Sequence, residues 1–582
     1  MLAGPIFSRE ALTSPRRLRH FLVRAGYVAA LFLLMWTAKQ VTVGFQDVYG
    51  AGELARFGSL VFQIFSLIQL SLALFFALVF SAANVAQEKD RRTLTLLLMT
   101  DLRDRELVLG KLGASLLLVG VLLAASLPVF VFLQFLGGVT LGQIFRVFAL
   151  CAAAAIAAGS WGSLVAFWRE KTFQTLAISV LGLVLFLGAV EGVVLLSGDT
   201  SAVGWWVGLL DPYRSLLMVL DPFGGAEADV LGLDPAWWSV LLMVALAVVL
   251  NGLAILRLRV WNPSRAVYES VRLQARQDAE DDAAVVARKR TRAVWSNPVL
   301  WREIRTRAYG RKTVLIKLAY LVLAAAAVYR LWQAGGDGEL LLGAIAPAGV
   351  AFVGLGVLSL MLINAQAVTA LTTERDEKTL EPLLMTDMTA KEFIYGKLGG
   401  IAFNTKELVL VPLALLAYYL AVGQLGLENS VYAVVTFLAL AAFATMLGVH
   451  YGLSYENSRS AIGVSLGTLF FLTFGIVVFM MLLVEARGSF LLQFQSFFIF
   501  IVVGSIGLWW ALKHKNPSTA LFLSALCLPF LTFYAITQFL IGGTLGVCLA
   551  ISAAYGFTTI AMLVPAVSEF DVALGRTTLD QG

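Results

Sequence analysis

Few side chains in this sequence could do chemistry, and their spacing excludes most enzyme classes. The three histidines, His20, His450 and His514, lie far apart, and no two of them have the spacing of metal ligands. The three cysteines all lie within apolar runs, which excludes a disulfide scaffold and a cysteine-based zinc site. We therefore predict no catalytic residue and no metal site in the chain.

Two Gly-Lys pairs, Gly110-Lys111 and Gly396-Lys397, come nearest to a phosphate-binding loop. Such a loop has the pattern G-x(4)-G-K-[ST], in which backbone amides and the lysine hold the phosphates. Each pair is followed by Leu instead, and neither has a glycine five residues before its own glycine. We therefore expect that this chain does not bind ATP and that its energy comes from another source.

Some charged residues fall within apolar runs, where a central charge costs about 2.5–3.5 kcal/mol on insertion scales. We assign Glu191 and the neighbours Lys406 and Glu407 as possible intramembrane polar contacts. The competing interpretation is that these side chains reach a membrane surface or pair with a neighbour near a helix end. The sequence leaves both interpretations open.

The composition indicates what kind of chain must position these residues. Of the 582 residues, 59% are hydrophobic and 14% are charged, and the mean hydropathy is +0.84. Soluble domains are usually about 45–50% apolar and about 25% charged, so a single soluble enzyme and a disordered protein are excluded. Apolar runs of the length that spans a bilayer occur about fourteen times. We predict an all-α polytopic membrane protein.

The charges of the loops predict its orientation. Basic loops alternate with loops poor in Lys and Arg; Arg16, Arg17 and Arg19 precede the first apolar run, whereas residues 335–339 contain neither Lys nor Arg. Because cytoplasmic loops carry an excess of these residues, both termini are predicted to be cytoplasmic.

An internal repeat sets the architecture. Residues 88–113 (EKDRRTLTLLLMTDLRDRELVLGKLG) and 374–399 (ERDEKTLEPLLMTDMTAKEFIYGKLG) share 14 of 26 residues without gaps, at an offset of 286. A weaker echo upstream pairs GPIFSRE, starting at Gly4, with NPVLWRE, starting at Asn297. The two copies keep the same predicted orientation, so the chain is predicted to be a parallel duplication of one module.

The apolar residues of the repeated motif follow helical spacing. Leu94, Leu97, Leu98 and Leu102 recur at i, i+3, i+4 and i+8, which predicts one apolar stripe on a short cytoplasmic helix. An alternative is a helix lying on lipid headgroups. The acidic residues of the motif are unfavourable beside anionic lipid, which favours docking to a protein.

Charge spacing supports the same helix in both copies. Glu88 with Arg92, and Glu374 with Lys378, are separated by four residues, the favourable order for an ion pair on a helix. The sequence therefore predicts one helix that continues through these residues.

The run E-x(4)-T-L-x-x-L-L-x-T followed by G-K, after the second span of a six-span unit, resembles the permease family of ABC-2-type ABC transporters. The N-P-V-L-x-R-E opening of the second copy also resembles that family. The resemblance implies two tandem parallel repeats of a six-span unit, with about 12–14 transmembrane helices in all. The implied units are residues 1–258 and 297–512, joined by a charged cytoplasmic linker at 259–296 and followed by additional terminal spans and a cytoplasmic tail at 513–582.

The resemblance also assigns roles to residues. In that family the first cytoplasmic loop carries a coupling helix that docks on the ATPase subunit, and an in-plane amphipathic helix precedes the first span. The implied ATPase-docking residues are Glu88, Thr93, Leu94, Leu97, Leu98, Thr100 and Glu106 in the first copy and Glu374, Thr379, Leu380, Leu383, Leu384, Thr386 and Glu392 in the second. The implied in-plane helices carry Pro5, Arg9 and Glu10 in the first copy and Pro298, Arg302 and Glu303 in the second.

We therefore expect the permease subunit of an ATP-driven ABC transporter, an exporter in the bacterial cytoplasmic (inner) membrane. Its expected partners are the lipid bilayer and two copies of a separate ATPase that binds ATP and Mg²⁺; no nucleic acid is expected, and the substrate is unknown. Two other classes stay open. An ATP-independent secondary transporter would need intramembrane acids or broken helices at equivalent places in both halves. A membrane scaffold for a cytosolic complex would need no transport path.

Overall fold

The computed structural model describes residues 4–13, 18–42, 50–198, 201–221, 234–262, 295–305, 313–334, 346–380, 388–486, 490–513 and 518–568. Within these ranges the chain forms 19 helices and no strands. Twelve helices are long and apolar enough to cross a membrane, and two shorter apolar stretches occur at Val314–Tyr329 and Phe497–Leu512. The predicted all-α polytopic fold is confirmed.

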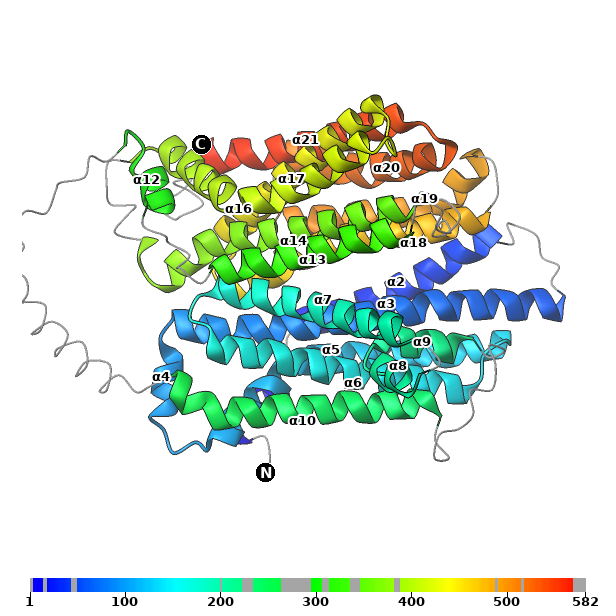
Figure 1. Cartoon of the computed structure of the whole chain (residues 1–582), viewed down its shortest axis with the longest axis horizontal. Helices are drawn as coiled ribbons and strands as arrows, with labels where there is room; N and C mark the ends of the chain where they lie inside the picture. The colour runs from blue at the N-terminus through cyan, green and yellow to red at the C-terminus, as the bar shows by residue number, and fades with distance from the viewer. Residues whose placement is uncertain are drawn as a thin grey trace, which may run out of the picture.

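The first half contains six long helices that run side by side. Its helices are α1 (Gly4–Thr13), α2 (Leu18–Thr42), α3 (Ala51–Asp90), α4 (Thr93–Leu98), α5 (Asp104–Leu136), α6 (Leu141–Trp168), α7 (Thr172–Ser197), α8 (Ala202–Gly208), α9 (Pro212–Leu220) and α10 (Pro235–Trp261). The short helix α4 lies at one end of the bundle, and α8 and α9 lie at the other (Figure 1). We call the end that carries α4 the motif end.

The second half repeats this order with helices of similar length. Its helices are α12 (Pro298–Arg305), α13 (Thr313–Ala334), α14 (Pro347–Asp376), α16 (Ala390–Ala421), α17 (Leu427–Ser454), α18 (Ser458–Ala486), α19 (Phe490–Leu512), α20 (Thr519–Ile541) and α21 (Thr544–Ser568). The short helix α12 lies at the same end as α4 (Figure 1). Both copies of the repeated motif therefore face the same side of the bundle.

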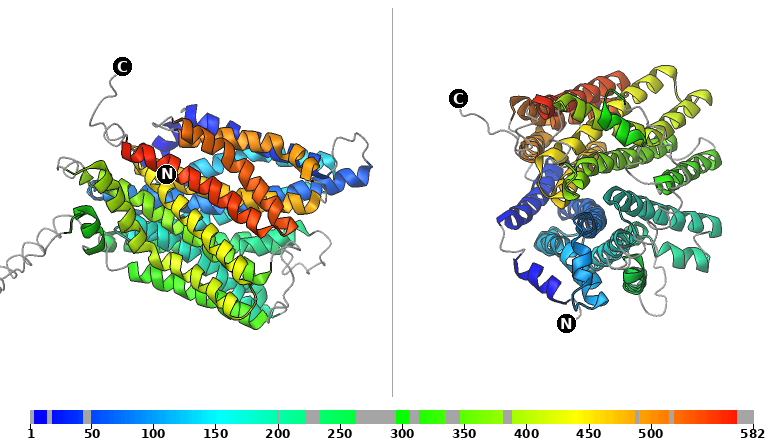
Figure 2. Two further views of the ribbon diagram at one scale, coloured as in Figure 1. Left: turned by 90° about the horizontal axis from the view of Figure 1, so that it is seen from above. Right: turned by 90° about the vertical axis from the view of Figure 1, so that its left-hand side faces the viewer.

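The two halves pack against each other with exchanged partners. In the first half α2 and α3 contact α18, and in the second half α13 and α14 contact α7. Since α7 and α18 are 286 residues apart, these contacts are equivalent and describe an approximate twofold relation between the halves. Aromatic side chains fill the α3–α18 contact, where the rings of Phe75 and Phe470 stack with centroids 4.3 Å apart. Figure 2 shows the two halves from two further directions.

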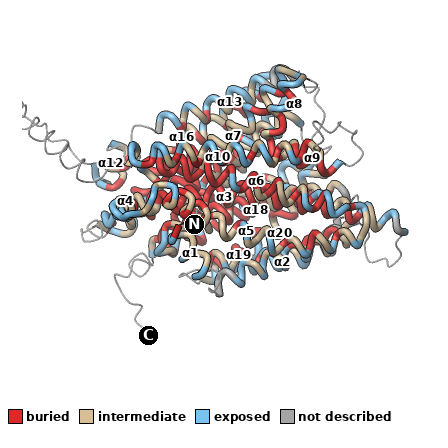
Figure 3. Tube along the Cα trace, turned by 90° about the horizontal axis from the view of Figure 1, so that it is seen from below, coloured by how far each residue is buried: buried red, intermediate tan, exposed pale blue. Residues whose placement is uncertain are grey.

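Small residues let the helices within each half approach closely. A Cβ at Gly162 of α6 would lie 2.7 Å from the carbonyl oxygen of Leu78 in α3, and one at Gly448 of α17 would lie 2.6 Å from the Cβ of Ala367 in α14. Close packing at glycine is typical of helices in membranes. Buried residues accordingly concentrate in the middle of the bundle, while the outer helix faces are exposed (Figure 3).

The last helix of each half packs in the same way. Helix α10 lies mainly against α6, and α21 packs against α17, the equivalent of α6, as extensively as against its neighbour α20. This packing makes α21 the counterpart of α10 and places the two unmatched helices, α19 and α20, before the last span of the second half. The sequence had suggested additional spans at the end of the chain. The unit boundaries at 258, 297 and 512 stay predictions.

Candidate functional site

Each repeated motif forms a joint between two spanning helices at the motif end. Helix α3 ends at Asp90 and α14 ends at Asp376, and the second residue after each end has a positive φ, +58° at Arg92 and +57° at Lys378. A left-handed residue other than glycine stops a helix. The predicted continuous helix through Glu88 is therefore wrong: in the first copy a separate helix, α4, begins at Thr93.

The glutamate that opens the motif pairs with the lysine that closes it. Glu88 binds Lys111, and the carboxylate of Glu374 lies 2.7 Å from Nζ of Lys397. The predicted pairs with Arg92 and Lys378, four residues away, are replaced by these longer connections. The Gly-Lys pair is thus the anchor by which the third span of each half holds the end of the second span.

The Thr-Leu dipeptide of the motif makes the same contacts in both copies. The hydroxyls of Thr93 and Thr379 donate to the carbonyl oxygens of Glu88 and Glu374, at 3.3 and 3.2 Å. The following leucines are buried, with 2% of Leu94 and 5% of Leu380 exposed. The two leucines therefore face the chain's own helices, whereas Thr93 and Thr379 are exposed. The assignment of all four residues to ATPase docking stays a prediction.

The glutamates later in the motif cap the next helix. The carboxylate of Glu106 accepts from the backbone amide of Arg103 at 3.1 Å, and that of Glu392 accepts from the amide of Thr389 at 3.0 Å. Thr389 returns the bond by accepting from the amide of Glu392 at 3.2 Å. Each glutamate satisfies a free donor at the helix start.

The helices α1 and α12, which precede the first span of each half, rest on glycines of the motif. A Cβ at Gly113 would lie 2.8 Å from the ring of Phe7 in α1, and one at Gly399 would lie 2.8 Å from Cδ1 of Leu300 in α12. Pro5 is the second residue of α1, and Pro298 is the first residue of α12. Glycine at these positions is therefore required for close contact between the short helix and the spanning helix.

In the second half, charged residues of α12 form ion pairs with the residues of the joint. Nζ of Lys397 lies 2.6 Å from the carboxylate of Glu303, and Arg302 binds Glu374. Lys397 and Glu303 are only 1% and 2% exposed. In the first half the equivalent Arg9 is exposed and Glu10 is half-buried.

The outward face of α4 and the two residues after it carry the side chains that a partner could reach. Leu96 is 64% exposed and Met99 is 60% exposed, and Thr100 is also exposed. Leu97 and Leu98 are half-buried and pack against the cluster around Leu94. The predicted apolar stripe thus faces the protein's own spans. In the second copy the predicted Leu383, Leu384 and Thr386 lie outside the described residues.

Equivalent polar contacts join the two halves beside the joints. Nζ of Lys171 lies 2.8 Å from the carboxylate of Glu377, and the guanidinium of Arg91 lies 3.5 Å from Oδ1 of Asn457. In each pair, one residue directly follows the second span of its half (α3 or α14). The other residue directly precedes the fifth span of the other half (α18 or α7). Arg91 also binds Asp376, with Nε 3.0 Å from Oδ1.

The comparisons with known proteins identify the first half. Residues 34–256 match the family described as ABC-2 family transporter protein. This half is an ABC-2 family transporter domain. The match covers α3 to α9, the end of α2 and most of α10, so it includes the complete first joint. A search of curated proteins found no match for the chain.

The charges predicted inside the spans have partners within the protein. Glu191 of α7 lies 3.4 Å from Nε of Arg214 in α9. Glu407 of α16 lies 2.7 Å from Nζ of Lys317 in α13, and Nζ of Lys406 lies 4.2 Å from the ring centroid of Phe403. The interpretation as paired charges is therefore supported, and a contact of these residues with substrate stays a prediction.

Sequence reasoning did not find the ion pairs that hold the joints together. The signal was present, because Glu88 and Lys111 recur at the same spacing as Glu374 and Lys397. From sequence alone it was interpreted as two separate features, a charge pair along a helix at Glu88 and a Gly-Lys pair compared with a phosphate-binding loop. Two charged residues of opposite sign that recur together at a fixed spacing of 23 predict a contact more directly than either does alone.

Proposed function

We propose that the chain is the membrane-spanning subunit of an ATP-driven exporter, with one ABC-2 unit in each half. The family of the first half supports an ABC transporter permease. The second half follows the same helix order and has an equivalent joint, which supports a second unit of the same kind. The distribution of basic loops supports a motif end on the cytoplasmic side of a bacterial inner membrane, with both termini on that side.

The observation that carries the proposal is the presence of two equivalent joints at one end of the bundle. Each joint ties the second span to the third through an ion pair, so a push on the short segment between them reaches both spans. We propose that one separate ATPase subunit docks at each joint and supplies the motion by binding ATP and Mg²⁺. Two ATPase subunits per chain follow from two joints.

The docking surface that we propose differs from the one expected from sequence. Because Leu94 is buried and Leu97 and Leu98 turn inward, the exposed Leu96 and Met99 form the apolar centre of the surface. Interface energy usually concentrates in a few such central residues, each costing about 2 kcal/mol or more when truncated. In the sequence of the second copy, Met385 corresponds to Met99.

The stoichiometry tests the proposed function. The chain is isolated from its native membrane in mild detergent, and the complex is weighed by native mass spectrometry. We expect two copies of a P-loop ATPase per chain and ATP hydrolysis only when they are present. A chain that carries no ATPase, or that transports in vesicles under an ion gradient alone, would return the secondary transporter or the scaffold to favour.

A pair of substitutions tests the docking surface. We expect Met99→Glu combined with Met385→Glu to lower the amount of bound ATPase at least about tenfold, since a charge is placed at the apolar centre. Leu12→Glu is the matched control, because Leu12 is an apolar residue of α1 with 66% of its surface exposed. Equal loss in both variants, or no loss in either, would contradict docking at α4.

A further inference from the structure

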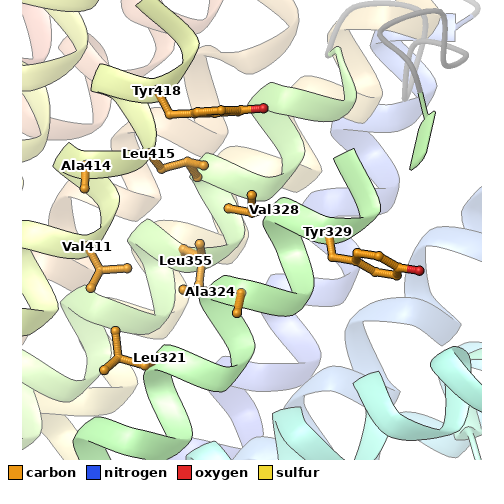
Figure 4. A pocket seen from close by; sticks show the side chains of 10 residues that line it. Leu321, Ala324, Val328, Tyr329, Leu355, Val411, Ala414, Leu415 and Tyr418 are labelled. Atoms are coloured by element: carbon orange, nitrogen blue, oxygen red, sulfur yellow. The ribbon is translucent and has the colours of Figure 1, made fainter. Parts of the chain in front are cut away.

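An apolar cavity of about 660 Å³ lies in the second half, between α13, α14 and α16. Its floor is buried and consists of Ala324, Leu355 and Leu415. Its rim consists of exposed side chains, among them Leu321 and Tyr418, so the cavity opens on the outer surface of the helices (Figure 4). In a membrane-spanning bundle this outer surface contacts lipid.

The cavity exists because α13 carries small side chains where the first half carries large ones. The Pro5–Pro298 match places Leu31-Phe32-Leu33-Leu34 of α2 opposite the four alanines at 324–327. The same register aligns Tyr27 with Tyr320, which supports it. Leu31 is 3% exposed in the first half and packs within its core, so the equivalent space is filled there.

A charged pair lies beside the cavity on the side of the motif end. Lys317 precedes Leu321 by four residues on α13, and Glu407 precedes Val411 by four residues on α16. Four residues are about one helical turn, or about 6 Å. Lys317 and Glu407 bind each other and are 34% and 31% exposed, so both remain accessible from the membrane surface.

This pair is incomplete within the part of the chain that the structure describes. The second carboxylate oxygen of Glu407, Oε2, is buried and has no hydrogen-bond partner there. A buried carboxylate oxygen without a donor is costly, because its lost hydration is not replaced. A hydrogen-bond donor that reached this oxygen after a rotation of the Glu407 side chain would remove that cost.

We propose that the cavity binds one acyl chain of a bilayer phospholipid whose headgroup carries a primary ammonium. The acyl chain fills the space along the alanines of α13. The headgroup lies at the exposed part of the Lys317–Glu407 pair, with its ammonium donating to the Glu407 carboxylate and its phosphate beside Nζ of Lys317.

Two features of the site favour this occupant. The cavity is almost entirely apolar and is continuous with the lipid-facing surface, so a bilayer chain reaches it without crossing water. The charged pair sits one turn from one end only, which matches an amphiphile with a single polar end. From Leu321 to Tyr329 the rim of α13 extends about 12 Å, less than half of a hydrocarbon core of about 30 Å. These residues lie around the middle of α13 (Thr313–Ala334), with the charged pair toward the motif end.

Photolabelling of the full chain tests the proposal. The chain is placed in phosphatidylcholine nanodiscs with a trace of phosphatidylethanolamine or of phosphatidylcholine, each carrying a photoactivatable acyl chain, and labelled peptides are mapped. We expect the phosphatidylethanolamine probe to label the segments of α13 and α16 that line the cavity. Uniform labelling of all lipid-facing helices by both probes would overturn the proposal.

Matched variants separate the chain site from the headgroup site. Ala324→Leu with Ala325→Phe introduces the larger side chains that α2 has at the equivalent positions, and these should fill the cavity. We expect labelling there to fall about tenfold. Ala326→Phe is the control, because Ala326 is exposed on the same helix and does not line the cavity. Glu407→Gln is expected to reduce labelling by the phosphatidylethanolamine probe to that of the phosphatidylcholine probe.

The reverse exchange is a control for misfolding, because it should cause labelling to be gained and not lost. Leu31→Ala with Phe32→Ala opens the equivalent space in the first half, and we expect it to gain chain labelling on α2. No headgroup preference is expected there, because Val121 stands where Glu407 stands in the second half. Labelling in the filled cavity variant equal to wild type, in protein with an unchanged melting temperature, would overturn the assignment of the cavity.

Discussion

Among the residues of the first half that the structure describes, Glu88 and Lys111 form the ion pair of the joint alone, and Arg9 of the flanking helix is exposed. In the second half the equivalent pair is joined by two charges of α12, so that Glu303, Glu374, Arg302 and Lys397 form one network. The motif is the same in both places. What differs is how far the preceding helix enters the joint.

One residue accounts for much of this difference. A Cβ at Gly400 would lie 2.5 Å from the Cβ of Glu303, so only glycine lets α12 come close enough to bury that carboxylate. The equivalent residue in the first half is Ala114, and Glu10 is half-buried there. A single methyl group on the spanning helix therefore separates a buried charge network from a simple pair.

The largest difference is expected when the lysine is removed. Lys397→Met leaves the buried Glu303 and Glu374 with Arg302 as the remaining cation of the network, so one negative charge is uncompensated, which costs about 3–5 kcal/mol. Lys111→Met leaves only Glu88, which is 20% exposed, so we expect about 1–2 kcal/mol. Melting temperatures of the purified chain in detergent measure both.

A triple variant sharpens this test. Lys397→Met with Glu303→Gln and Glu374→Gln removes both carboxylate charges and leaves Arg302, which is 32% exposed, so the triple variant should recover much of the loss. Equal destabilisation by Lys397→Met and Lys111→Met would show that burial of the second network has no energetic consequence.

A smaller effect is expected from converting the second joint into the first. Gly400→Ala should displace Glu303 from Lys397 and cost about 1–3 kcal/mol, the usual range for overpacking. Because it breaks the contact that Lys397→Met also breaks, the two substitutions should be less than additive. Additive losses would mean that Gly400 and Lys397 act independently.

The smallest effects are expected at the contacts between the halves. Lys171 and Glu377 are 38% and 32% exposed, so a double-mutant cycle with alanine should give about 0.2–1 kcal/mol, falling as salt is raised. The cycle for Arg91 and Asp376 should give more, because Asp376 is 3% exposed and also accepts from Ser458. A larger coupling at Lys171–Glu377 would reverse this order.

Much of the fold follows from local sequence. Apolar runs predicted the spanning helices, because a spanning helix is defined by residues close in the chain. The match between two segments at an offset of 286 residues predicted two equivalent halves. The parallel order of α3, α5, α6 and α7 with α14, α16, α17 and α18 agrees with that offset. The ABC-2 family of the first half was also predictable from the motif.

The direction in which the motif faces was not predictable. Helical spacing showed that Leu94, Leu97 and Leu98 share a face, but a stripe of leucines suits a partner protein and the chain's own spans equally well. The left-handed residue Arg92 rotates α4 relative to α3, and no local signal predicts a positive φ at an arginine. The lipid cavity was not predictable either, because finding it required a residue-by-residue comparison of α13 with α2 once their packing was known.

The position of α19 and α20 bears on how such a chain can grow. In the first half the chain leaves α7 at the end opposite the motifs, passes through α8 and α9, and enters α10 from that same end (Figure 1). In the second half α19 and α20 replace that excursion with one crossing in each direction, so α21 also starts from that end. An insertion made of an even number of crossings preserves the sidedness of everything that follows it. Parity, rather than length, is then the constraint on what evolution can add between these two spans.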